Sequence, residues 1–196
     1  ASMTVNPIAP IVGNDSVCVG SGTYLTNIVG GGVWTSSFPA IASISSDSGL
    51  VYGLSPGVTN ITYTLPTGCV AYGNVTAIAM PSAITGVNQV CPGGITSLAN
   101  ATPGGVWRSN NPGVATVTPT TGVVTGVFAD TTSIYYTILP NCTVSEIVTV
   151  NPTPQPIVAR SPICPGIADT LFSASPGGMW SSNTPALATV IDSSGI

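Results

Sequence analysis

The sequence repeats itself with a step of 73 residues. Aromatic residues and cysteines recur at this step: Trp34, Trp107 and Trp180; Cys18, Cys91 and Cys164; Cys69 and Cys142; Tyr63 and Tyr136. Self-similarity at a fixed period indicates an array of like structural units. The 196 residues divide into two full units and an incomplete third, at 1–79, 80–152 and 153–196. We expect the third unit to be completed by residues beyond Ile196, or by strands that a neighbouring subunit donates.

Proline gathers where one unit meets the next. The linker prolines are Pro7 and Pro10, then Pro81, then Pro152, Pro154 and Pro156. Proline-rich linkers favour extended, semi-rigid geometry over free swivelling. The sequence therefore predicts an elongated array whose first partners are the neighbouring repeats of the same chain.

Short runs of alternating apolar and polar residues fill each unit. In the second unit these runs lie at 95–99, 105–109, 114–117, 122–127, 133–139 and 144–150. A leading strand near Ile84 brings the total to about seven, which is typical of a small sandwich. No apolar pattern at helical spacing lasts longer than a turn, so we expect an all-β fold of tandem β-sandwich domains of about 73 residues.

The segment 104–117, Gly-Gly-Val-Trp-Arg-Ser-Asn-Asn-Pro-Gly-Val-Ala-Thr-Val, is followed by Thr-Gly-Val-Val-Thr-Gly at 121–126 and by Ile-Tyr-Tyr-Thr at 134–137. These segments resemble the bacterial immunoglobulin-like group 2 domain, which builds the stalks of intimin- and invasin-like adhesins. The lysine-poor composition with cysteines resembles the repeats of giant Bacteroidota surface adhesins, including gliding-motility adhesins exported by type IX secretion. The resemblance implies immunoglobulin-like domains with a structural, extracellular role and no catalytic residues.

Each full unit contains two cysteines that are 51 residues apart. Equal spacing favours pairing within each unit, Cys18 with Cys69 and Cys91 with Cys142, tying strand ends at one pole of each sandwich. Such disulfides indicate an oxidising, extracellular compartment. The register places the partner of Cys164 beyond Ile196, and the alternatives for this odd cysteine are intermolecular pairing or a reactive thiol.

Charge is scarce, and this excludes several classes of function. Only 4% of residues are charged, compared with roughly 25% in ordinary soluble domains. The two basic residues, Arg108 and Arg160, stand alone, so we expect no nucleic-acid binding. No apolar run reaches the roughly 18 residues of a spanning helix, so we expect no membrane insertion.

Groups for catalysis or metal binding are equally sparse. The chain has no His and a single Glu, Glu146, and its aspartates occupy different positions of the repeat: Asp15, Asp47, Asp130, Asp169 and Asp192. General acid–base catalysis needs a group that titrates near the operating pH, and zinc sites need clustered Cys or His. We therefore expect no enzyme, no cofactor and no metal site, with calcium at a linker as the alternative.

Two sets of residues have a structural or a modification role in this interpretation. Because the apolar neighbours of Trp34, Trp107 and Trp180 recur as well, these tryptophans, with Tyr63 and Tyr136, are predicted core residues; a sugar-stacking platform is the alternative. If the resemblance to Bacteroidota proteins holds, O-glycosylation after Asp falls on Ser16, Thr131 and Thr170.

These observations predict a stalk or filament segment of a long extracellular repeat adhesin, acting in attachment or gliding. Besides the neighbouring repeats, surface glycans or other cell-surface proteins are the candidate partners. The alternative function is a glycan-binding accessory module of a secreted enzyme. That alternative requires exposed aromatic residues on one repeated face. Tyr24, Tyr52 and Tyr72 are replaced by Ser97, Thr125 and Ser145 one step later.

Overall fold

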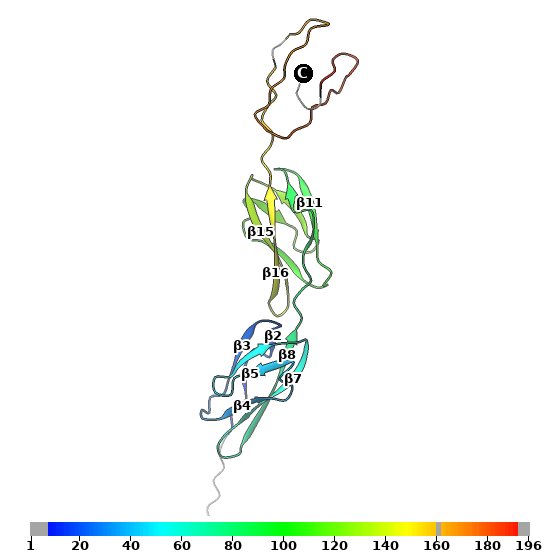
Figure 1. Cartoon of the computed structure of the whole chain (residues 1–196). Helices are drawn as coiled ribbons and strands as arrows, with labels where there is room; N and C mark the ends of the chain where they lie inside the picture. The colour runs from blue at the N-terminus through cyan, green and yellow to red at the C-terminus, as the bar shows by residue number, and fades with distance from the viewer. Residues whose placement is uncertain (1–7, 160–161, 192–196) are drawn as a thin grey trace, which may run out of the picture.

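A computed structural model describes residues 8–159 and 162–191 of the chain. Domain 1 contains β1 (Val12–Gly13), β2 (Ser16–Cys18), β3 (Gly22–Thr26), β4 (Val33–Ser36), β5 (Ala42–Ile44), β6 (Leu50–Gly53), β7 (Gly57–Thr64) and β8 (Val70–Ile78). Domain 2 contains β9 (Thr85–Gly86), β10 (Gln89–Val90), β11 (Ile95–Ala99), β12 (Val106–Ser109), β13 (Ala115–Val117), β14 (Val123–Gly126), β15 (Thr131–Ile138) and β16 (Cys142–Val150). The two domains stand end to end (Figure 1).

Both domains have the same topology. One four-stranded sheet has the order β1-β3-β6-β5 in domain 1 and β9-β11-β14-β13 in domain 2. The other has the order β2-β8-β7-β4 and β10-β16-β15-β12. The prediction of an all-β chain of tandem sandwiches is confirmed, and the structure shows no helix in the residues that it describes.

One strand pair in each domain is parallel, and this pair decides where the cysteines lie. β2 runs parallel to β8, with Val17 opposite Ala77 and Cys18 opposite Ile78. β10 runs parallel to β16, with Val90 opposite Val150. The other pairings between the strands β1 to β16 are antiparallel. The end of β2 therefore lies beside the end of β8, where the chain leaves domain 1.

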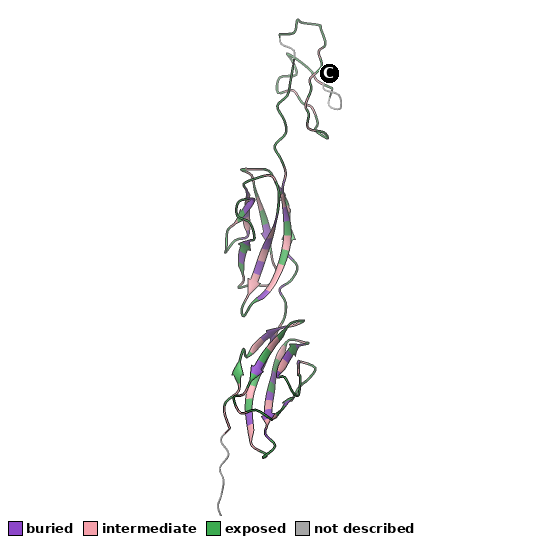
Figure 2. Cartoon of the chain, turned by 90° about the vertical axis from the view of Figure 1, so that its left-hand side faces the viewer, coloured by how far each residue is buried: buried purple, intermediate pink, exposed green. Residues whose placement is uncertain are grey.

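Alternation along the central strands builds each core. On β7, Thr59, Ile61 and Tyr63 are buried while the residues between them are more exposed, as expected for a strand with one face on the core (Figure 2). The ring centroids of Trp34 and Tyr63 lie 4.4 Å apart in domain 1, and those of Trp107 and Tyr136 lie 4.7 Å apart in domain 2. Trp34 and Trp107 are each 5% exposed, so both rings are part of a packed interior.

Residues 151–191 differ from the two domains. In the described part of this segment the only strand-like pairing is an isolated bridge between Val158 and Phe172. Trp180 is half-buried there and belongs to neither core cluster, unlike the core position expected for it. In the equivalent positions of domains 1 and 2, the Trp strand pairs with the long strand β7 or β15, whose counterpart is absent from this segment.

The described residues include no helix with the length and apolar character needed to cross a membrane.

Candidate functional site: the junction between the domains

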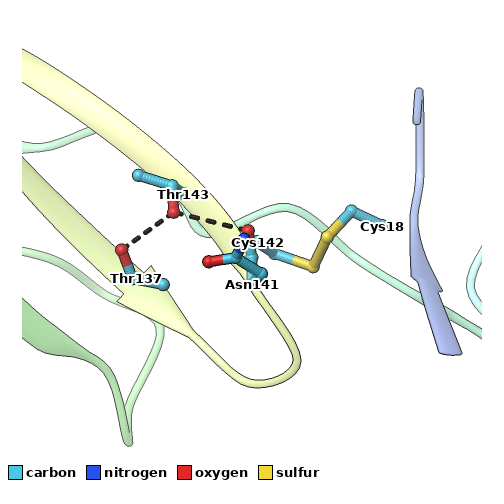
Figure 3. The surroundings of a disulfide bond; sticks show 5 residues. All are labelled: Cys18, Thr137, Asn141, Cys142 and Thr143. Atoms are coloured by element: carbon cyan, nitrogen blue, oxygen red, sulfur yellow. Dashed lines mark hydrogen bonds between the residues drawn. A yellow bond between two sulfur atoms is a disulfide. The ribbon is translucent and has the colours of Figure 1, made fainter. Parts of the chain in front are cut away.

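A disulfide joins the two domains. Cys18, at the end of β2, is bonded to Cys142, at the start of β16, across 124 residues of sequence (Figure 3). Their Cα atoms lie 5.5 Å apart, within the usual range for a disulfide. The junction is therefore covalent at two places, through the peptide linker and through this bridge.

The expected pairing of Cys18 with Cys69, and of Cys91 with Cys142, was wrong. Parallel pairing puts Cys18 beside Ile78, whereas Cys69 stands at the opposite end of β8, about 30 Å along the strand. Cys91 likewise follows the end of β10 beside Val150, far from the start of β16. The two cysteines of one unit thus lie at opposite poles of the sandwich and cannot approach each other.

Three cysteines have free thiols in the structure. Cys69 is half-buried next to the hairpin between β7 and β8, where it packs against the core of domain 1. Cys91 is exposed after β10, and Cys164 is exposed within residues 162–191. These thiols stand apart from the junction, so the bridge between Cys18 and Cys142 has no neighbouring thiol as a competitor.

Strand pairing and a side-chain hydrogen bond stabilise the hairpin that carries Cys142. Cys142 pairs with Ile138 in the last register position between β15 and β16. The hydroxyl oxygens of Thr137 and Thr143 lie 2.8 Å apart across the same hairpin, as Figure 3 shows. Cys142 is fully buried and Cys18 is 9% exposed. Because thiol–disulfide exchange needs access to a sulfur atom, this burial protects the bridge from reductants.

The peptide linker is fastened to domain 2 by side chains of the segment that follows β11. The Asn100 amide donates to the Ser82 carbonyl oxygen at 2.6 Å, and the Ser82 amide donates to the Thr102 hydroxyl at 2.9 Å. Pro81 and Ile84 are buried, which anchors the linker on both sides of Ser82. We call Asn100 and Thr102 the linker clamp.

The linker clamp recurs with the 73-residue step. In domain 1, the Asn27 amide donates to the Ala9 carbonyl oxygen at 2.6 Å. In the segment after domain 2, the backbone amide of Gln155 donates to the Ser175 hydroxyl at 2.7 Å, as the Ser82 backbone amide does to Thr102. The clamp is therefore a property of the repeat, and the sequence analysis missed it.

A chain of contacts connects the linker clamp to the core of domain 2. The Tyr136 hydroxyl donates to the Thr102 carbonyl oxygen and accepts from the Gly105 amide at 2.8 Å. Tyr136 also packs against Trp107. The direction of the linker is thus set by the same aromatic pair that fills the domain interior.

Replacing Asn100 by Ala tests the linker clamp. We expect domain 2 to lose about 1 kcal/mol of unfolding free energy, the usual net value of a hydrogen bond. Asn100 Oδ1 also accepts from the backbone amide of Thr102 and so positions the Thr102 hydroxyl, which accepts from the Ser82 backbone amide. We therefore also expect faster exchange of the Ser82 backbone amide, measured by hydrogen–deuterium exchange. Asn110→Ala is the control, because the Asn110 side chain is exposed and makes no hydrogen bond within the residues that the structure describes. Equal exchange at Ser82 in both variants would contradict the clamp.

The other candidate residues do not gather into a site. No group of three or more Asp, Glu, Cys or His residues capable of holding a metal occurs among the described residues, and Asp192 lies outside them. Thr131 and Thr170 are exposed and Ser16 is half-buried, so the O-glycosylation sites stay a prediction. Tyr24 and Tyr52 are exposed on neighbouring strands of domain 1, and domain 2 has Ser97 and Thr125 in their places.

Comparison with known proteins identifies the fold. No protein-family model matches the chain, and no curated protein matches its sequence. A solved structure of the C-terminal 282-residue fragment of intimin, in complex with the intimin-binding domain of the translocated intimin receptor, has a TM-score of 0.52. The two share 17% identity over 79% of this chain and 67% of that fragment. The domains are immunoglobulin-like β-sandwiches.

Weaker likenesses extend to other proteins with similar domains. Domains 4 and 5 of the S-layer protein SbsC have a TM-score of 0.35 and 15% identity, over 76% of this chain and all of that one. Murine CEACAM1b has a TM-score of 0.32 and 11% identity, over 74% of this chain and all of that one.

Proposed function

We propose that this chain is a structural spacer segment of a long, repetitive adhesin on a bacterial cell surface. The observation that carries the proposal is the Cys18–Cys142 bridge, which locks two consecutive domains into one covalent unit. A spacer must keep its length and direction under load, and a second covalent link across the junction supplies both. The role needs no catalytic or cofactor site.

The bridge also supports a location outside the cytoplasm, and the arrangement of the domains supports a spacer. Disulfides persist in oxidising compartments and are rare in the cytosol. The two domains stand end to end, and the linker between them is fastened by the linker clamp (Figure 1). Repeat arrays gain reach by stacking like units, each of which contacts its neighbours.

We propose further that the adhesin is of the Bacteroidota type, exported by type IX secretion and acting in gliding or attachment. This finer proposal rests on the composition and on the group 2 resemblance. The similar intimin fragment was solved bound to a receptor domain, so a cell-surface protein is a fitting partner for the assembled adhesin. Surface glycans are the other partner class, and a glycan-binding accessory module of an enzyme is the competing function.

The natural polypeptide tests the proposal. We expect a mass many times 19.5 kDa on a denaturing gel under reducing conditions, and release of the repeats from intact cells by an added protease. A cytosolic protein of the same cells serves as the control for lysis, because the added protease cannot cleave it while the cell envelope is intact. A polypeptide that stays protected from the protease until the cells are lysed would contradict a surface location.

A further inference from the structure

Cys91 occupies in domain 2 the position that Cys18 occupies in domain 1. Both cysteines follow the short strand that runs parallel to the last strand of the domain, β10 or β2. Both stand one repeat step apart, as do Cys69 and Cys142. Each domain therefore carries a cysteine of the Cys18 kind at one pole and a hairpin cysteine of the Cys142 kind at the other.

The backbone presents Cys91 in the same way as Cys18. The Ser21 amide donates to the Cys18 carbonyl oxygen at 2.9 Å, and the Gly94 amide donates to the Cys91 carbonyl oxygen at 2.9 Å. The glycine two positions after each cysteine has a left-handed φ, +83° at Gly20 and +77° at Gly93. The turn that aims Cys18 at the neighbouring domain is thus already formed around Cys91.

The two positions differ in what lies against them. Cys18 is buried because the hairpin of domain 2 is seated on that pole, whereas Cys91 is exposed. Cys69 cannot fill the place, because it stands at the far pole of domain 1, with about 60 Å of strand length between the two thiols. Cys91 thus has the same local geometry as Cys18, but no hairpin of another described domain covers it.

We propose that Cys91 forms a bridge of the Cys18–Cys142 kind with the hairpin cysteine of a further repeat docked on the outer pole of domain 2. The occupant is a repeat of this same type on the same chain, and Cys69 is the hairpin half of a like junction on the other side of domain 1. One cysteine of each bridge then lies within the loop that the previous bridge closes, as Cys91 lies between Cys18 and Cys142 in the sequence. We call this series of overlapping disulfides the ladder.

The ladder changes which residues carry load. Force that enters domain 1 at Cys18 crosses the bridge to Cys142 and then follows the chain to Cys164, the next cysteine of the Cys18 kind. The strands between the bridged cysteines lie outside this path. The inference deepens the proposed spacer role, and it depends on that role only for the expectation of consecutive repeats.

Duplicating one repeat within the full chain tests the inference. The variant contains residues 1–152 followed by 80–196, which adds a second Cys91 and a second Cys142 in the register of the natural junction. We expect the first Cys91 to pair with the second Cys142, so that alkylation without reduction labels three thiols, as in the parent chain. Non-reducing peptide mapping identifies the linked peptides.

Two single substitutions in the duplicated chain serve as controls. Changing the first Cys91 to Ser should free the second Cys142 and add one labelled thiol, whereas Cys164→Ser should remove one and leave both bridges intact. Labelling of both added cysteines would overturn the inference. Bridging of Cys91 to Cys69 between two parent chains, seen as dimers that reduction dissociates, would overturn the same-chain occupant. Neither result depends on where the protein resides, so the proposed function is tested separately.

Discussion

Replacing Trp107 by Ala should cost domain 2 about 3–5 kcal/mol of unfolding free energy. The indole is 5% exposed and packs against Tyr136, whose hydroxyl fixes the segment that holds the linker clamp. The substitution leaves a cavity under β12 and loosens this tyrosine. A loss of this size is a large part of the stability of a domain with a small core.

The measurement is urea unfolding followed by far-ultraviolet circular dichroism, with exchange of individual amides to assign the loss to domain 2. Trp180→Ala is the matched control, because this residue has the same repeat position but is less deeply buried than Trp107 and belongs to neither core cluster. We expect a much smaller change there. Unchanged unfolding of Trp107→Ala together with altered sugar binding would favour a stacking platform.

Much of the fold could be predicted from the sequence because its signals are local. Alternation with period two marked the long strands, such as β15 and β16, within one or two residues of their ends. The 73-residue step then predicted the equivalent of each strand in the other domain. Residues 151–159 and 162–191 did not follow this prediction, because a sandwich forms only when both sheets are present to bury each other's apolar face.

The cysteine pairing could not be predicted in this way. A spacing of 51 residues within a unit and one of 124 across a junction recur with the same period, so periodicity alone cannot choose between them. The choice depends on the direction of β2 relative to β8, and side-chain alternation is the same in parallel and antiparallel strands. Only the pairing of strands shows that Cys18 and Cys69 lie at opposite poles.

The linker clamp was missed for a related reason. Asn27 and Asn100 recur at the repeat step, but their acceptors are backbone carbonyl oxygens of Ala9 and Ser82, which leave no trace in side-chain identity. A polar side chain repeated just after a predicted strand, facing a proline-rich linker, is the signal that could have found it. Such a repeated polar residue indicates a fixed junction between domains rather than a binding site.

The junction also sets how the chain responds to force. The bridge closes a loop that contains most of both domains, since it joins residues 124 positions apart. In the chain-entropy model, closing a loop of this length removes about 5 kcal/mol of conformational freedom from the unfolded state. Under tension the disulfide has a second effect: while it is intact, the residues that it encloses cannot be extended by the applied force.

We therefore expect Cys18→Ser to lengthen the fully unfolded chain by about 40 nm in single-molecule force spectroscopy, since about 3.5 Å of contour is released per enclosed residue. Handles at the two termini of the 196-residue chain place the bridge in the load path. Reductant should produce the same gain in the parent chain once unfolding exposes the buried sulfurs. Cys164→Ser, which removes a free thiol, should leave the length unchanged. Equal lengths for the parent and Cys18→Ser would show that the two domains are not bridged.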